Sequence, residues 1–351
     1  MSLLTLLSSF VITTVFLFVL KPLAGKIGLI DIPGGRKIHL APTPVMGGIG
    51  IYLGILCVSL FTPAILQHYG MMLAISGLVL LVGIYDDARD MNASVRMGIH
   101  ALAALLMVLL ADNQLLSLGN ILGMGPVTLG LLAIPVTMFA TAGVINAVNM
   151  TDGVDGLSGG LVLISLGFIS LAAFISGHGA LLSFSTALMC ALLAFLALNF
   201  RLPWKRSALI YLGDAGSTLL GFILTWLIIE ATQGPDAIMA PVYALWFLAV
   251  PLIDTVNLLI KRPLRGVNPF SAGTDHVHHR LLAAGFSHQK TVIGLYLASL
   301  ITGGIGLLGY LYQASEALMF FGFLALFLLY MTSGRYLKYL SLRCRSLPAG
   351  E

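Results

Sequence analysis

Residues 146–160, with the sequence NAVNMTDGVDGLSGG, lie between two long apolar runs and carry four polar side chains at intervals of three. These side chains belong to Asn146, Asn149, Asp152 and Asp155. Residues three apart share a helix face, but Gly153 and Gly156 indicate that a helix ends within the segment. We therefore expect a polar rim with exposed backbone N–H groups, which suits the binding of a phosphate or a nucleotide base.

Three other clusters of ionisable residues occur in the chain. YDDARD holds Asp86, Asp87 and Asp90, YLGDAGS holds Asp214, and AGTDHVHHR holds Asp275, His276, His278 and His279. The adjacent carboxylates of Asp86 and Asp87 repel each other unless a cation lies beside them. Because the clusters contain carboxylates and no thiolate, they favour a hard divalent ion, of which Mg2+ is the commonest. Such a set of groups is suited to phosphoryl chemistry on an anionic substrate.

Each cluster also has an ordinary structural interpretation. A lone aspartate such as Asp214 usually caps a helix or faces water, the DDARD segment fits a solvated turn, and a histidine-rich run is often a wet loop. The combination favours function, because carboxylates at the edge of a membrane are costly and are usually retained for a role.

The composition predicts that these clusters are positioned by membrane helices. Only 9% of the 351 residues are charged and 58% are hydrophobic, with a mean hydropathy of +1.00. A soluble domain would carry charge on about a quarter of its residues, and about 20 apolar residues suffice to cross a bilayer. We therefore predict an all-α, polytopic integral membrane bundle of about eleven helices.

The predicted spans cover residues 3–20, 45–61, 71–85, 97–112, 129–148, 157–175, 180–198, 216–231, 239–259, 291–312 and 316–332. The first is interpreted as a retained helix, because residues 1–9 contain no basic residue of the kind that opens a signal peptide. The three cysteines form neither a disulfide framework nor a metal-binding spacing.

The basic residues define the predicted orientation. All 18 lie in alternate connections or in the C-terminal tail, whereas the other connections hold Asp112, Asp236 and Glu316. The positive-inside rule then predicts a periplasmic N-terminus and a cytosolic C-terminus. We expect a single catalytic domain of residues 1–334 and a basic cytosolic tail of residues 335–351. The net charge of +4 follows from this sorting and needs no nucleic-acid partner. The predicted cytosolic active-site loops are residues 21–44, 86–96, 146–156, 199–215 and 260–290.

Five motifs resemble those of the polyprenyl-phosphate N-acetylhexosamine-1-phosphate transferases of bacteria. They are PVMGG (44–48), DDARD (86–90), NAVNMTDGVDGL (146–157), YLGDAGST (211–218) and DHVHH (275–279), and the resemblance covers essentially the whole chain. It implies transfer of GlcNAc-1-phosphate from UDP-GlcNAc to undecaprenyl phosphate with release of UMP. It also implies dependence on Mg2+ or Mn2+, a place in the inner membrane with the active site on the cytosolic face, and a first membrane step in O-antigen or enterobacterial common antigen synthesis. A homodimer is left open.

The resemblance assigns roles to residues in the matching motifs. The residues assigned to catalysis are Asp86, Asp87, Asp152 and Asp155. Those assigned to the metal are Asp214 and Asp87. Those assigned to substrate binding are Asn149, Tyr211, Arg262, Arg265, His276, His278 and His279. Asp86 and Asp87 match an acidic pair in which one member is proposed as a base, but we favour a role in holding the cation or orienting the acceptor.

Several alternatives remain open from the sequence. The donor could be another UDP-N-acetylhexosamine, with GalNAc or N-acetylfucosamine, or UDP-MurNAc-pentapeptide, although Val277 interrupts the histidine triplet of the enzymes that use the last. An intramembrane aspartyl protease would have glycine in place of Tyr211, and a CDP-alcohol phosphotransferase would follow its first DG with an Ala-Arg pair. A secondary transporter would place acids near mid-span, and Asp254 is the acid that fits it best.

Overall fold

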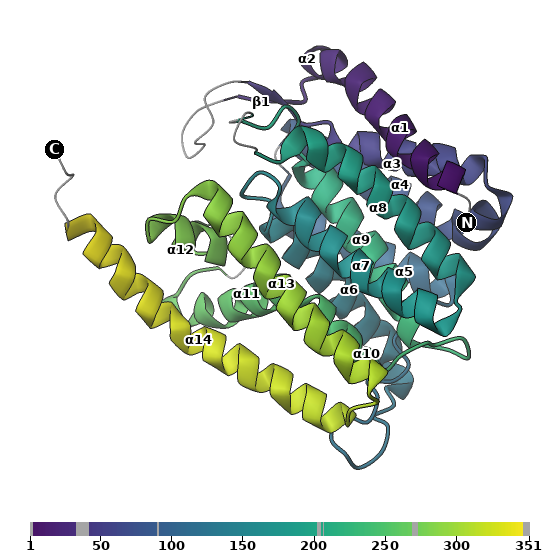
Figure 1. Cartoon of the computed structure of the whole chain (residues 1–351), viewed down its shortest axis with the longest axis vertical. Coiled ribbons are helices and arrows are strands. Elements are labelled where there is room, and N and C mark those ends of the chain that lie inside the picture. Colours follow the sequence, from purple (N-terminus) through teal and green to yellow (C-terminus); the bar gives the residue numbers. More distant parts are fainter. Residues whose placement is uncertain are drawn as a thin grey trace.

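The computed structural model describes residues 3–346 except residues 33–41, 90, 202–204, 206 and 269–272, with side chains described from residue 5 to residue 333. Helices dominate this part of the chain (Figure 1). The α-helices are α1 Leu3–Leu20, α2 Ala24–Ile27, α3 Gly47–Leu60, α4 Pro63–Arg89, α5 Ala93–Ala111, α6 Ala133–Met150, α7 Leu157–Ser176, α8 Gly179–Asn199, α9 Gly213–Thr232, α10 Pro241–Phe247, α11 Ala249–Lys261, α12 Val277–Ala283, α13 His288–Leu311 and α14 Glu316–Ser346. The 3-10 helices are η1 Lys21–Leu23, η2 Gly130–Leu132 and η3 Pro263–Arg265. The short strands β1 Ile30–Asp31 and β2 Thr43–Pro44 pair antiparallel.

The helices confirm the predicted membrane-protein fold. Among the described residues, nine helices are long and apolar enough to cross a bilayer, or ten if the bent pair α10 and α11 forms one span. Every predicted span overlaps a helix, and the count differs from about eleven at two places. One is α3, whose 14 residues give a length of about 21 Å against a hydrocarbon core of about 30 Å.

The second difference is the bend of 88° between α10 and α11. Pro251 lies in the first turn of α11. Proline has no backbone N–H to donate four residues back, and its ring clashes with the carbonyl group there. That carbonyl belongs to Phe247, where α10 ends. The predicted span of residues 239–259 is therefore broken at its proline.

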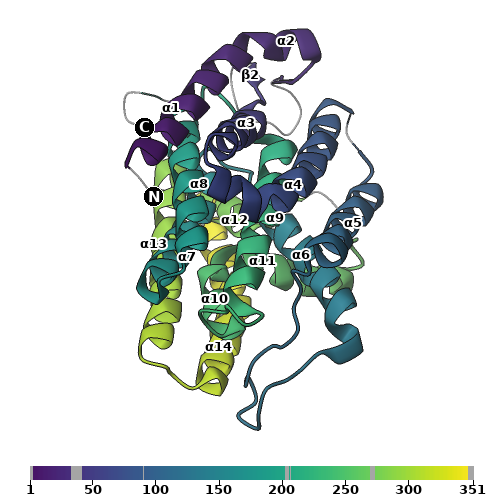
Figure 2. The same cartoon turned by 90° about the vertical axis from the view of Figure 1, so that its right-hand side faces the viewer.

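Helix α9 forms the centre of the bundle and is the most buried of the candidate spans. It packs against α3, α4, α6 and α7 (Figure 2). Two glycines permit close approach of its neighbours: a Cβ on Gly48 of α3 would lie 2.4 Å from the Cα of Gly216, and one on Gly83 of α4 would lie 2.3 Å from the Cα of Ala215. Gly83 lies one helical turn before Asp87, so this packing brings the acidic end of α4 to the first turn of α9.

The polar motifs gather at one end of the bundle. The last residues of α4 and α6 and the first residues of α9 meet there. The β1–β2 pair and α12 lie at the same end of the bundle, away from the N-terminus (Figure 1). Tyr211 is fixed to this pair, because its N–H donates to the carbonyl of Pro44. Helix α14 continues unbroken across the predicted domain boundary at residues 334 and 335.

Candidate active site

Two carboxylates from other elements hold the N-terminus of α9. Asp87, near the end of α4, accepts hydrogen bonds from the backbone N–H groups of Asp214 at 2.8 Å and Ala215 at 3.1 Å. Asp152, which follows α6, accepts one from the N–H of Gly213. The first N–H groups of a helix lack partners within it and carry the positive end of its dipole, so carboxylates are stabilised there. Asp87, Asp152 and Asp214, which come from distant parts of the sequence, therefore converge at the start of α9.

The side chain of Asp214 connects three elements. Its Oδ1 accepts a hydrogen bond from Asn149 Nδ2 at 2.6 Å, and its Oδ2 lies 3.5 Å from Arg96 Nη1. The same nitrogen donates to Asp86 Oδ2 at 2.5 Å, and the carboxyl groups of Asp86 and Asp214 are hydrogen-bonded to each other. Two carboxyl groups in such contact need a proton or a cation between or beside them. Arg96 supplies one positive charge to this cluster.

The negative charge of the cluster acts on Asp152. Burial raises the pKa of Asp152 well above its usual value, and the carboxylates of Asp214, Asp87 and Asp155 raise it further. The hydrogen bond from Gly213 lowers this pKa but does not offset the other effects. The neighbourhood therefore carries more negative charge than its own groups neutralise, and it favours the binding of a proton or a cation.

The donor chemistry of the cluster fits a hard divalent ion that is shared with a substrate. Within the described residues, no group of three or more His, Cys, Asp or Glu side chains is arranged to hold a metal by itself. Mg2+ is commonly bound by one or two carboxylates together with waters and substrate phosphates. The contacting carboxylates of Asp86 and Asp214 suit that mode. Both oxygens of Asp87 accept backbone N–H groups, and those of Asp86 accept the N–H of Met91 and Arg96 Nη1. Either acid would therefore exchange one of these contacts to share a metal with Asp214.

A second pair of charges flanks the 146–156 motif. Asp155 Oδ2 accepts a hydrogen bond from Arg201 Nε at 2.6 Å, and the two side chains form an ion pair. Burial raises the pKa of the Tyr211 hydroxyl, and the Asp155 carboxylate raises it further, whereas Arg201 and the side chain of Thr43 lower it. Tyr211 therefore lies beside the end of the motif that holds Asp155, where an aromatic face is suited to stacking on a base.

The residues 275–280, here called the histidine loop, contact the 146–156 motif directly. His278 is buried, and a Cβ added to Gly153 would lie 2.4 Å from its Nε2. The rings of His276 and His278 are parallel within 5°, with centroids 5.6 Å apart, and the ring of His279 lies 4.3 Å from that of His278. Burial and the adjacent histidines His279 and His276 lower the pKa of His278 to about 3. The ring is therefore neutral at physiological pH.

The two arginines predicted to bind substrate have different surroundings. Arg262 is buried and donates to both carboxylate oxygens of Asp275, at 2.6 Å from Nη2 and 3.1 Å from Nε. These hydrogen bonds lower the pKa of Asp275. Arg262 thus holds the first residue of the histidine loop, Asp275, in place. Arg265 on η3 is exposed. Direct contact with a ligand is easier for Arg265.

Three site residues escaped the sequence analysis. Arg96 and Arg201 were interpreted only as charges that set topology, although each is the ion-pair partner of a predicted catalytic aspartate. Asp254 was associated only with a transporter, although it contacts the histidine loop. A rule that every buried acid needs a nearby donor could have prompted a search for such partners among the basic residues of the same face.

Comparisons with known proteins cover the segments that form this site. Residues 69–232 match the family model described as Glycosyl transferase family 4, a range that contains the acids of α4 and α9 and the 146–156 motif. A relative from Escherichia coli O157:H7, named undecaprenyl-phosphate alpha-N-acetylglucosaminyl 1-phosphate transferase, is 37% identical over 326 residues, which are 93% of this chain and 89% of the relative. The chain belongs to the polyprenyl-phosphate N-acetylhexosamine-1-phosphate transferase family.

Two relatives of the same name extend the comparison to other bacteria. The protein of Yersinia pestis is 37% identical, with 92% of this chain and 88% of the relative covered. The protein of Haemophilus influenzae is 38% identical, with 90% and 89% covered. In this member of the transferase family, the similarity to the relatives therefore extends well beyond the range matched by the family model.

Proposed function

We propose that the protein transfers GlcNAc-1-phosphate from UDP-GlcNAc to undecaprenyl phosphate, releasing UMP and forming GlcNAc-diphosphate-undecaprenol. The observation that carries this proposal is the convergence of Asp86, Asp87, Asn149, Asp152 and Asp214 at one end of an apolar bundle. At that position, a membrane lipid and a water-soluble nucleotide can meet. The name of the relatives supports the acceptor and the transferred group.

The reaction needs charge neutralisation and positioning more than deprotonation, because the phosphate of the lipid is already anionic at neutral pH. An oxygen of that phosphate forms a bond to the β-phosphorus of the donor. The bond from the β-phosphorus to the oxygen that bridges the two donor phosphates breaks, and UMP leaves with the electron pair. The chain supplies no proton to this step.

The contacts of the described residues suggest a role for each of them in this reaction. Asp87 and Asp152 fix the N-terminus of α9, and Asn149 orients Asp214. Asp86 and Asp214 would hold Mg2+ or Mn2+, which would offset the charge that develops on the donor phosphates. Tyr211 would stack on the uracil base, and the histidine loop would contact the donor diphosphate.

The proposed location is the bacterial inner membrane, with the site on the cytosolic face. The sorting of all 18 basic residues to alternate connections and the tail supports it. UDP-sugars are made in the cytosol, so a site on that face would have access to the donor. The product would then begin a surface glycan of the O-antigen or enterobacterial common antigen type.

A panel of substrates tests the proposal. Purified protein with Mg2+ and undecaprenyl phosphate is offered UDP-GlcNAc, UDP-GalNAc, UDP-N-acetylfucosamine or UDP-MurNAc-pentapeptide, and UMP release is measured. We expect UMP chiefly with UDP-GlcNAc and none without the lipid. Release only with UDP-MurNAc-pentapeptide would assign the protein to another branch of the family, and no release with any donor would refute transferase activity. A secondary transporter would also release no UMP, but the acids of this site lie at helix ends, away from mid-span.

Arg96 offers a test of the charge balance in the site. Arg96→Ala leaves Asp86 and Asp214 without their shared arginine, so we expect a lower thermal unfolding midpoint than in the wild type. Mg2+ should raise that midpoint more in this variant than in the wild type, because a bound cation stabilises the folded state and takes over the lost charge. Arg89→Ala is the control, since Arg89 is exposed on the same end of α4. If Mg2+ raised the unfolding midpoint equally in the wild type and both variants, a cation site at Asp86 and Asp214 would be contradicted.

A further inference from the structure

Asp254 is a buried carboxylate outside the acid cluster, and it contacts three polar groups from two other helices. It lies on α11 and is 2% exposed. His276 Nδ1 lies 3.1 Å from its Oδ2, and the N–H of Val277 donates to its Oδ1 at 3.1 Å. The hydroxyl of Tyr330, on α14, donates to the same Oδ1. The carboxylate therefore connects α11, the start of α12 and α14.

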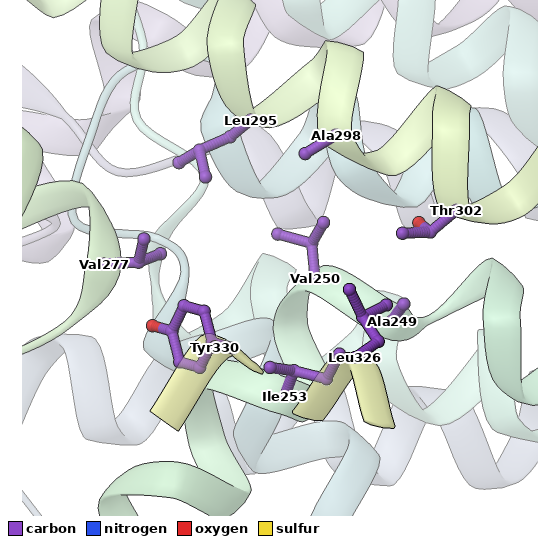
Figure 3. A pocket seen from close by; sticks show the side chains of 9 residues that line it. All are labelled: Ala249, Val250, Ile253, Val277, Leu295, Ala298, Thr302, Leu326 and Tyr330. Atoms are coloured by element: carbon purple, nitrogen blue, oxygen red, sulfur yellow. The ribbon is translucent and has the colours of Figure 1, made fainter. Parts of the chain in front are cut away.

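The cavity beside these contacts is lined mainly by apolar side chains. Figure 3 shows Tyr330 and Val277 at one end of a cavity between α11, α13 and α14, with aliphatic side chains such as Ile253 and Leu326 along its wall. A charged group in such a place is retained only when its hydrogen bonds are satisfied. The same low polarity strengthens the hydrogen bonds that are made. Asp254 thus binds the histidine loop firmly.

The contact with His276 has a chemical consequence. A carboxylate is acceptor-only, so the Nδ1 of His276 carries the proton in this hydrogen bond. The ring is then held in one orientation, and its Nε2 is the nitrogen that remains for a ligand. Carboxylates fix the tautomer and the orientation of functional histidines in the same manner in other sites.

His276 is linked to the 146–156 motif through the packing of His278. Its ring lies parallel to that of His278, and His278 packs against Gly153 of the 146–156 motif. A rotation of His276 would therefore disturb the surface that the histidine loop presents to the motif.

We propose that Asp254 is a positioning residue that sets the tautomer and orientation of His276 for contact with the donor diphosphate. Tyr330 of α14 assists by binding the same carboxylate. The expected contact of His276 with the donor diphosphate rests on the proposed function, whereas the contact between Asp254 and His276 does not. In this proposal Asp254 fixes the histidine loop to α11, a role other than the transport for which the sequence suggested it.

A double-mutant cycle tests the proposal. Asp254→Asn, His276→Ala and the double variant are compared in UMP release, with KM measured separately for UDP-GlcNAc and undecaprenyl phosphate. We expect Asp254→Asn to reduce kcat/KM for the donor by about tenfold to a hundredfold, with little change in the KM for the lipid. The double variant should lose no more than His276→Ala alone, because Asp254 acts through His276. Multiplied losses in the double variant, or a fall in kcat that only follows a fall in the unfolding midpoint, would overturn the proposal.

A milder variant and a spectroscopic measurement complete the test. Tyr330→Phe removes one donor to Asp254 and should cause a smaller loss in the same donor-specific parameter if Asp254→Asn fails to fold. NMR of 15N-histidine-labelled protein, assigned with His276→Ala, should show a protonated Nδ1 on His276 in the wild type and its loss in Asp254→Asn. A wild type that shows this signal but releases no UMP would refute the proposed function while leaving the contact intact. Absence of the signal would refute the positioning role itself.

Discussion

Asp214→Asn is expected to reduce the rate of UMP release by about a thousandfold. The substitution keeps the size of the side chain but removes the charge that meets Asn149, Arg96 and Asp86. Removal of one preorganised electrostatic contact commonly costs a hundredfold to a thousandfold in rate. Here the same carboxylate is also a proposed ligand of the divalent ion, so we expect the upper end of that range. Steady-state UMP release in detergent at saturating Mg2+ provides the measurement.

The matched control is Asp112→Asn. Asp112 is exposed after α5, at the other end of the bundle, and its backbone has a positive φ of 51°. Asparagine tolerates this left-handed conformation well, so the control makes the same chemical change without backbone strain. It should retain the wild-type rate. An Asp214→Asn enzyme with a rate within about threefold of the control would exclude Asp214 from the essential machinery that we propose.

Gly153→Ala is expected to reduce kcat/KM for UDP-GlcNAc by about a hundredfold. A Cβ at this position would lie 2.4 Å from Nε2 of His278, which is closer than real side chains pack. The ring is confined by His276 and His279, so the histidine loop must move away from the motif. Displacement by about 1 Å of groups that position a substrate can cost about a hundredfold.

Gly143→Ala provides the comparison for this substitution. Gly143 lies on α6, which leads into the motif, and a Cβ there has no neighbour within 4 Å. Alanine also favours a helix more than glycine does, so this variant should be as active as the wild type and as stable or more stable. If Gly153→Ala behaved in the same way, the contact between the histidine loop and the motif would have no part in the reaction.

The sequence allowed much of this site to be predicted, because its polar residues interrupt apolar runs. Asp87, Asp152 and Asp214 come from three distant segments, and the predicted orientation alone placed them at one end of the bundle. Their partners could not be predicted in the same way. The contact of Arg96 with Asp86 and Asp214 depends on how α4 and α5 pack against α9, and that packing depends on glycines such as Gly83.

The departures from the predicted helices have local causes. The apolar run that includes α3 was predicted to span the membrane from residue 45. The helix begins only at Gly47, because Val45 forms a β-bridge with Tyr211. Pro251 bends the span that includes α10 and α11. A hydropathy pattern shows where apolar residues lie, but it does not show which of them pair through their backbone with another segment.

Transfer of the β-phosphorus together with the sugar is the most direct test of the account. Purified protein is given Mg2+, undecaprenyl phosphate and UDP-GlcNAc that carries 32P at the β-phosphate and 3H in the sugar. We predict that both labels enter the lipid in equal amounts, with one UMP released for each lipid formed. Transfer of 3H without 32P, accompanied by UDP, would show an ordinary glycosyl transfer and would contradict the proposed attack on the β-phosphorus.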